Sequence, residues 1–252
     1  MSSVKQIKNT VHIYSHIWNL ENYLRNNIII NYMTLFYGTW KIMDHMRVPC
    51  MTYFASMTKE DDLNELKGVE LLGRWSDLGT ASGSCIFRAN NYMDAASWLY
   101  NWVPMATCQV KPICDDNTAR RIILKAEPTY TVDYSNVGSE PNEGETLFLI
   151  NYKFNTQSRV DGNNLFANLS KEQDEGDSGN CRPLGRWHDL GNGTGVAVAA
   201  ATSEEDVYKW AFNWASMCEC TVTPVLTDDQ CRSVIRSKED FADRMAQVQA
   251  SM

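Results

Sequence analysis

The chain has 252 residues, of which 44% are hydrophobic and 21% are charged, and its formal net charge is -8. This balance is typical of a globular protein with a buried core and excludes an intrinsically disordered chain. Nucleic-acid binding relies on clustered lysines and arginines, so an acidic chain with scattered basic residues predicts no nucleic-acid partner. The eight cysteines are too few for a disulfide scaffold, which favours a reducing intracellular compartment, the cytoplasm or a plastid stroma.

The first 47 residues differ from the rest of the chain. Glu21 and Asp44 are their only acidic residues, and the apolar run 28–37 has about half the length that a bilayer-spanning helix needs. We therefore expect no transmembrane segment. Residues 1–47 are interpreted as an appendage, which is a targeting segment, an extra helix or an upstream extension of the gene model.

The chain contains an internal repeat. Residues 73–123 recur without a gap at 185–235, and 19 of these 51 paired positions are identical. A repeat of this length predicts two copies of one structural unit. The order of elements within one copy therefore defines the fold of both.

In chain order, each copy predicts a strand, a helical connector, two strands around a Gly-rich turn, a helix and a fourth strand. The strands of the first copy are expected at residues 48–55, 71–78, 84–89 and 108–113. Those of the second copy are expected at residues 146–154, 184–190, 196–201 and 220–226. The first copy has a short connector, whereas the second has a longer insert that ends in a solvated acidic loop at 172–179.

This order predicts an α+β fold of two ferredoxin-like βαββαβ repeats. Helices on one face leave the other face of each sheet bare, so we expect the two sheets to pack together as an intrachain pseudo-dimeric α/β barrel. The expected boundaries are repeat 1 at 48–124, an acidic Pro/Gly linker at 125–145, repeat 2 at 146–235 and an amphipathic C-terminal helix at 236–252.

Three segments of the second copy carry a family resemblance. The string Leu184-Gly185-Arg186-Trp187-His188-Asp189-Leu190-Gly191 and the run Trp210–Trp214, followed by 222–226, resemble a family known only as a domain of unknown function. This family lies in the dimeric α/β-barrel superfamily, which contains haem-degrading and quinol-forming monooxygenases, polyketide cyclases and non-catalytic proteins. The resemblance therefore implies a fold but no activity. The first copy matches less well, because Ser76 replaces His188.

His188 is the natural candidate for chemistry, because it is the sole histidine of the two expected repeats and histidine is the residue type suited to proton transfer near neutral pH. It is a candidate general base, haem ligand or metal ligand, with Arg186, Trp187, Asp189 and Trp214 as candidate ligand-binding neighbours. In a strand, Arg186 and His188 point to one face and Trp187 and Asp189 to the other, so no His–Asp dyad forms within the strand. The alternative is a hydrogen-bonded structural histidine.

The first copy offers Arg74, Trp75 and Asp77 as the matching ligand-binding candidates. The Arg/Asp pairs of both copies either bind an anionic ligand or form ion pairs that hold the hairpin or the interface. The paired tryptophans of the two long helices either form the floor of an aromatic pocket or belong to the core.

Cys218 and Cys220 form a C-x-C motif, which without further ligands at suitable spacing is more typical of buried thiols than of a metal site. We therefore expect no metal and no cofactor. The sequence lacks the common hydrolase, nucleotide-binding and zinc-protease motifs in a suitable context.

These observations favour a non-catalytic protein that assembles with itself or binds a small aromatic or anionic ligand. One alternative is a small-molecule enzyme of the α/β-barrel monooxygenase or cyclase type, with its site at His188. Another is a shell-like self-assembling protein of an algal plastid, because the proteins around the pyrenoid are similar in architecture.

Overall fold

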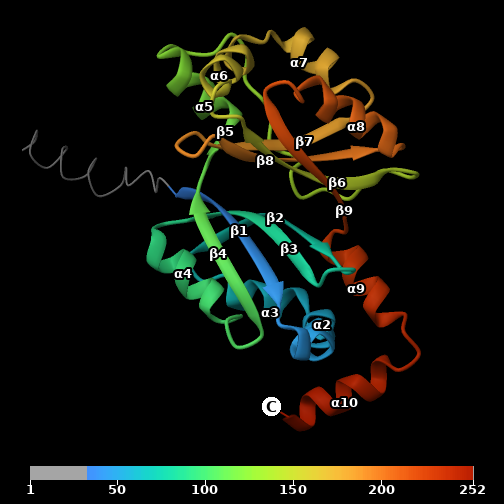
Figure 1. The fold of residues 1–252 in the computed structure, drawn as a ribbon. Coiled ribbons are helices and arrows are strands. Elements are labelled where there is room, and N and C mark those ends of the chain that lie inside the picture. The colour runs from blue at the N-terminus through green and yellow to red at the C-terminus, as the bar shows by residue number, and fades with distance from the viewer. Residues whose placement is uncertain (1–32, 252) are drawn as a thin grey trace, which may run out of the picture. The chain divides into compact units, whose positions relative to one another are not determined.

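The computed structural model describes residues 33–251, and two antiparallel sheets form its centre (Figure 1). The first sheet has the order β2-β3-β1-β4, with β1 Thr34–Ile42, β2 Val69–Asp77, β3 Ser82–Ala89 and β4 Ala106–Pro112. The second sheet has the order β5-β7-β8-β6-β9, with β5 Cys114–Asp115, β6 Thr146–Phe154, β7 Arg182–Asp189, β8 Thr194–Ala201 and β9 Cys218–Val225. In each sheet the first and third long strands of a repeat pair at the centre, which confirms the ferredoxin-like arrangement.

Helices cover the outer face of each sheet. In Figure 1, α4 lies against the first sheet and α8 against the second, on the sides that face away from each other. The helices of the first repeat are η1 Asp44–Met46, α2 Arg47–Ser56, α3 Lys59–Glu65, α4 Tyr92–Tyr100 and α5 Asp116–Leu124. Those of the second repeat and the C-terminus are α6 Arg159–Asn168, α7 Lys171–Ser178, α8 Glu204–Asn213, α9 Asp228–Arg236 and α10 Phe241–Ser251.

The first strand of repeat 1 is not where the sequence predicted it. Residues 48–55 lie inside helix α2, and the strand is β1, which is central in its sheet. Pro49 is tolerated in α2 because it lies in the first turn, where backbone N–H groups have no partner in the helix. Residues 34–47 therefore belong to the repeat and not to an appendage. Residues 1–32 of the predicted appendage lie outside the described residues.

The two repeats have equal connectors. Strand β1 and helix α2 lie 112 positions before β6 and α6, the same offset that relates the motifs at Gly73 and Gly185. The predicted insert in the second copy is therefore wrong. The acidic segment 172–179 is also no loop, because α7 occupies most of it and begins with a capping box between Ser170 and Gln173.

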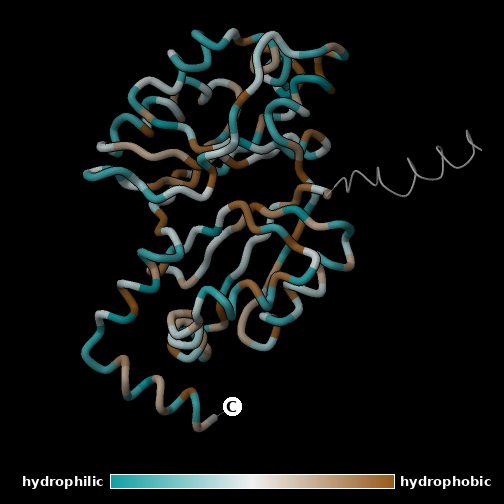
Figure 2. Tube along the Cα trace, turned by 180° about the vertical axis from the view of Figure 1, so that it is seen from behind, coloured by the Kyte–Doolittle hydropathy of each residue, from teal (hydrophilic) through white to brown (hydrophobic). Residues whose placement is uncertain are grey.

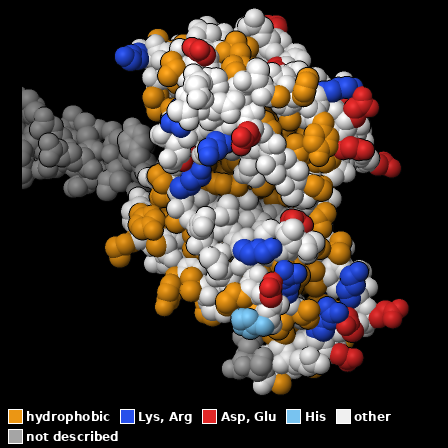
Figure 3. All heavy atoms as spheres, viewed as in Figure 1, with side chains coloured by type: hydrophobic (Ala, Val, Ile, Leu, Met, Phe, Trp, Pro, Cys, Tyr) orange, Lys and Arg blue, Asp and Glu red, His pale blue; other side chains and the backbone are white. Residues whose placement is uncertain are grey.

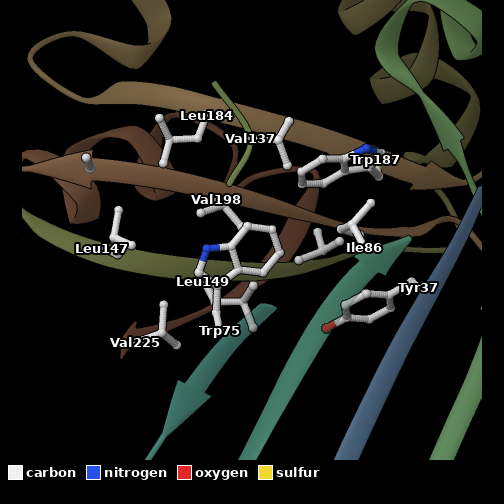
Figure 4. Packing of buried hydrophobic residues seen from close by; sticks show 12 residues of the cluster. Tyr37, Trp75, Ile86, Val137, Leu147, Leu149, Leu184, Trp187, Val198 and Val225 are labelled. Atoms are coloured by element: carbon white, nitrogen blue, oxygen red, sulfur yellow. The ribbon is translucent and has the colours of Figure 1, made fainter. Parts of the chain in front are cut away.

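The main core lies between the two sheets. Figure 4 shows Trp75 and Ile86 of the first sheet facing Leu149, Trp187 and Val198 of the second. The two indoles are each 1% exposed, and their ring centroids lie 6.3 Å apart. The burial of both inner faces confirms the intrachain packing of sheet against sheet.

The end of each repeat crosses to the other repeat. Strand β5 pairs with β7, where Cys114 lies opposite His188, and the equivalent Leu226 exchanges two backbone hydrogen bonds with Ser76 of β2. Helix α5 then packs on α6 of the second repeat, whereas α9 packs on α2 of the first. Within residues 33–251 the sheets are thus joined at two short points, and they form no closed barrel.

Residues 125–145 form neither helix nor strand, as expected of a linker, but they are not simply solvated. Val137 is 3% exposed and belongs to the core between the sheets, and Tyr134 contacts the Trp187 ring. The linker therefore passes through the interface between the two repeats.

The C-terminal helix begins at Phe241, later than the predicted residue 236, because α9 extends to Arg236. Helix α10 packs against α2, and Phe241 contacts the cluster that contains Ala55 and Ile235. Figure 2 shows hydrophobic and hydrophilic residues alternating along this helix.

The surface seen in Figure 3 carries lysines and arginines interspersed with aspartates and glutamates, and its basic residues form no continuous patch. No helix within residues 33–251 is long and apolar enough to cross a membrane.

Candidate functional site

Strand β7 sends its side chains to the two faces predicted from the alternation. Arg186 and His188 point to the outer, helix-covered face, whereas Trp187 belongs to the core between the sheets. Asp189 lies at the hairpin turn, where it accepts hydrogen bonds from Asn192, and its Oδ2 lies 3.3 Å from Lys111 Nζ. The structure thus brings Arg186 and His188 together and separates Trp187 and Asp189 from them.

Both ring nitrogens of His188 contact protein groups. Nδ1 lies 2.5 Å from the hydroxyl of Tyr152 on β6, and Nε2 lies 2.5 Å from Oδ1 of Asp116, the first residue of α5. The side chains of His188 and Asp116 are 5% and 2% exposed. Because the ionised Asp116 can only accept, Nε2 of His188 carries a hydrogen and donates to it. In the neutral form of the ring, Nδ1 then accepts the hydrogen of Tyr152.

Asp116 is held in its ionised form by Arg186. Burial favours the neutral acid, but the charge of Arg186 and the hydrogen bond from His188 outweigh it and keep the pKa of Asp116 well below its usual value. The guanidinium donates from Nη2 to Oδ2 of Asp116 at 2.7 Å and from Nε to Oδ1 at 3.1 Å. It also reaches Asp174 of α7, which in turn accepts from the buried Arg120.

The first repeat has the same charged network at the equivalent positions. Arg74 donates to Asp228 of α9 at 2.5 Å and to Asp62 of α3 at 3.0 Å, and Asp62 pairs with Arg232. The predicted pairing of Arg74 with Asp77 is therefore not found, since Asp77 accepts hydrogen bonds within its own turn. Because α5 and α9 cross to the other repeat, the arginines hold the interface between the copies.

A pocket lies between the second sheet and its outer helices. We call it the second-repeat pocket, and its wall is mainly aromatic and aliphatic. The polar residues His188, Tyr152 and Arg186 are among those that line it. Trp210 and Trp214 also line it, and both indole N–H groups donate to Asp177 of α7. The candidate Trp214 thus belongs to a pocket wall as well as to the helix packing.

An equivalent first-repeat pocket lies between the first sheet and its helices. Arg74 and Asp77 line it, whereas Trp75 is buried between the sheets. Trp40 replaces Tyr152 and Ser76 replaces His188, so this pocket lacks the Tyr–His pair. The two repeats share the ion network but differ in the polar end of the pocket.

His188 has no free ring nitrogen for a metal or haem iron, because Tyr152 and Asp116 engage both. Cys218 and Cys220 share one face of β9, with their sulfur atoms 3.7 Å apart. Among residues 33–251, no group of three or more His, Cys, Asp or Glu side chains is arranged to hold a metal ion.

Gly195 provides the space for the Tyr152 hydroxyl. A Cβ at this position would lie 2.1 Å from that oxygen and 2.4 Å from the backbone oxygen of Trp187. We expect Gly195→Ala to lower the free energy of unfolding by about 1–3 kcal/mol, measured by urea denaturation. The control is Gly176→Ala in α7, where the Cβ meets nothing within 4 Å and helix propensity predicts a gain of up to about 1 kcal/mol. Equal changes in the free energy of unfolding for Gly195→Ala and Gly176→Ala would contradict the assignment of Gly195 as the space for the Tyr152 hydroxyl.

The sequence pattern does not mark three of the site residues. Asp116 falls at the predicted start of a helix, although it is identical to Asp228 in the repeat. Asp174 falls in the segment predicted as a solvated loop. Tyr152 corresponds to Trp40, so comparison of the copies could not mark it as functional.

The fold and the paired networks define the class of protein: a tandem ferredoxin-like protein whose two repeats form an intrachain pseudo-dimer. The family model described as "Domain of unknown function (DUF3303)" matches residues 34–127 and again residues 146–239. The chain belongs to this family and carries its domain twice. No curated protein matches the sequence.

Several solved structures are similar in fold. A protein of Lactobacillus acidophilus provisionally named a monooxygenase is 9% identical, with a TM-score of 0.41, and the match covers 77% of this chain and 94% of that one. A protein of Fusobacterium nucleatum with the same provisional name is 10% identical, with a TM-score of 0.44 and coverages of 78% and 93%. A mutant chlorite dismutase from Candidatus Nitrospira defluvii is 11% identical, with a TM-score of 0.47 and coverages of 79% and 94%.

Proposed function

We propose that the protein binds a small, mainly apolar aromatic molecule in the second-repeat pocket. The observation that carries this proposal is the composition of the pocket: an aromatic and aliphatic wall with one polar end, formed by His188, Tyr152 and Arg186. Small-molecule sites are mostly apolar with a few placed polar groups, and the lining of this pocket has that composition.

The ion network supports a preformed pocket. Arg186 is anchored on two carboxylates, and the Phe166 ring packs on both Arg186 and His188, 4.9 Å from the guanidinium carbon and 4.5 Å from the imidazole centroid. Side chains held on several sides lose little freedom on binding, which favours affinity. The ligand therefore meets a polar end that is already in place.

Ala197 of β8 offers a test, because it is buried and lines the second-repeat pocket. We expect Ala197→Leu to fill the pocket and to weaken the binding of 4-nitroanisole at least tenfold, which corresponds to about 1.4 kcal/mol. Isothermal titration calorimetry measures the affinity, and circular dichroism verifies that the variant is folded.

The matched control is Cys85→Leu, at the equivalent position in the first-repeat pocket. The proposal expects this variant to bind 4-nitroanisole as the wild type does. If Cys85→Leu lost binding while Ala197→Leu retained it, the ligand would bind in the first-repeat pocket, which would contradict the proposal. Absence of saturable binding to the wild type would refute the proposed function.

A further inference from the structure

The chain Tyr152–His188–Asp116 connects the second-repeat pocket to a buried carboxylate. Its two links are each 2.5 Å long, and no other hydrogen-bonded partner of the Tyr152 hydroxyl is found within residues 33–251. Because this hydroxyl donates to His188, its oxygen keeps a lone pair, and Tyr152 is one of the residues that line the pocket. The polar end therefore presents a hydrogen-bond acceptor backed by an imidazole.

The charges behind His188 are balanced. Asp116 and Asp174 are opposed by Arg186 and Arg120, so the buried network contains two charges of each sign. A proton added to His188 lies directly against the Asp116 carboxylate and gives the cluster one net positive charge. That charge is compensated when the pocket holds an anion, because opposite charges at short range stabilise each other in a poorly solvated site.

The first repeat shows that this arrangement is not required by the fold. It keeps the equivalent arginines and aspartates, yet it has Trp40 and Ser76 where the second repeat has Tyr152 and His188. An interface that needed only the ion network is thus already complete without the tyrosine and the histidine. Their presence in one copy calls for a role in the pocket.

We propose that Tyr152 and His188 form a proton relay that accepts the hydroxyl proton of a phenol or enol bound in the second-repeat pocket. The O–H bond of the ligand breaks and its proton passes to the Tyr152 oxygen, while the proton of Tyr152 passes to Nδ1 of His188. The products are a ligand oxyanion, a neutral tyrosine that donates to it, and an imidazolium paired with Asp116. Atoms and charge balance, and no oxidant or co-reactant is needed.

The chemistry of the relay selects this ligand class. Phenols and enols are acidic enough for an imidazole to share their proton, whereas aliphatic alcohols are far weaker acids. The relay rests on the proposed function, since it needs a ligand in the pocket. The relay goes beyond the proposed function by specifying that the ligand carries an acidic hydroxyl and is held as its anion.

The test uses 4-nitrophenol, whose anion absorbs visible light, and compares it with 4-nitroanisole, which has no ionisable hydroxyl. Bound to the wild-type protein, 4-nitrophenol is expected to have its pKa lowered by about one unit or more relative to the free probe, read from the phenolate absorbance across a pH series. Tryptophan fluorescence quenching measures binding independently of ionisation.

Other titratable groups lie near the Tyr152 hydroxyl and the bound probe. Arg186, Asp116, Cys114 and Cys218 face Tyr152 from β7, α5, β5 and β9. Burial raises the pKa of Cys114 to about 12, and the hydrogen bond with its neighbouring thiol raises the pKa of Cys218. Cys114 and Cys218 therefore stay neutral, and the arginine and the aspartate stay charged, across the titration of the probe. The hydrogen bond with Cys218 lowers the pKa of Cys220, which also lines the pocket, so the pH series is repeated with Cys220→Ala.

His188→Gln and Tyr152→Phe are both expected to abolish the lowering of the 4-nitrophenol pKa. Because a one-unit shift corresponds to about tenfold tighter binding of the anion than of the phenol, both are also expected to weaken binding of the anion about tenfold. Two variants are used because either one alone could perturb folding. Ser76→Ala, at the equivalent position of the first repeat, is expected to leave the shift unchanged.

A lowered pKa that persists in folded His188→Gln would overturn the relay. So would an unshifted 4-nitrophenol pKa in the wild type when 4-nitroanisole binds, and this outcome leaves the proposed function intact. Failure of both probes to bind would overturn the proposed function together with the relay.

Discussion

Replacing Asp116 with alanine is expected to lower the free energy of unfolding by about 3–5 kcal/mol, because one partner of a buried ion pair is removed. The Asp116 side chain is 2% exposed and accepts from both Arg186 and His188. Its loss leaves Arg186 with Asp174 alone and the Nε2–H of His188 without an acceptor. Urea denaturation followed by circular dichroism measures the effect.

The matched control is Asp228→Ala, which removes the equivalent carboxylate of Arg74. Asp228 is 27% exposed, so water partly replaces it, and we expect a smaller loss of about 1–2 kcal/mol. A loss below about 1 kcal/mol for Asp116→Ala, or losses of equal size in the two variants, would contradict this account.

The pH dependence of stability follows from the same carboxylate. The folded-state pKa of Asp116 is depressed, so its contribution is fully present above its unfolded value of about 3.9 and decreases as the pH falls toward the folded value. The stability difference between the wild type and Asp116→Asn is therefore expected to narrow below about pH 4. If this difference in the free energy of unfolding stayed constant from neutral pH into that range, Arg186 and His188 would not be holding Asp116 in its ionised form.

Replacing Trp187 with alanine is expected to lower the free energy of unfolding by about 3–5 kcal/mol, as for other large-to-small changes in a packed core. Trp187 is 1% exposed and packs on Trp75 and Tyr134, at the point where the two sheets and the linker meet. Since the cluster joins both repeats, we expect the variant to unfold in one cooperative transition. Urea denaturation then measures the lowered free energy of unfolding.

The control for the core is Phe212→Ala in α8. Phe212 is 78% exposed, so its removal is expected to change the free energy of unfolding by less than about 0.5 kcal/mol. A Trp187→Ala variant as stable as Phe212→Ala would mean that the sheets do not pack through this cluster.

The sequence predicted the fold class and most strands because their cause is local. Alternating apolar residues, glycine-rich turns and the 112-residue offset mark the hairpins and the helices. The first strand was misplaced because residues 48–55 are rich in branched and aromatic residues, although Pro49 suits the first turn of a helix. Extending the 112-residue offset towards the N-terminus from Gly73 identifies residues 34–42, which form β1, as the equivalent of β6.

The candidate site was predicted only in part. Alternation within one strand placed Arg186 and His188 on the same face, and the structure confirms this. Their partners come from other elements: Asp116 reaches the site because α5 crosses to the second repeat, and Tyr152 because β6 lies two strands away from β7 in the sheet. No local pattern encodes such crossings. The identical pairs Asp116/Asp228 and Arg120/Arg232 were the available indication that charged residues act together across the copies.

Self-assembly into larger structures, considered from the sequence, stays a prediction. The intrachain pseudo-dimer already buries the inner face of each sheet, so no second copy is needed for that purpose.

A crystal structure of the full chain with 4-nitrophenol would test the central claim most directly. The account predicts electron density for the ring between the second sheet and Trp210 and Trp214, with the phenolic oxygen within hydrogen-bond distance of the Tyr152 hydroxyl. Density for the probe in the first-repeat pocket or on the surface alone, with the second-repeat pocket empty, would contradict it.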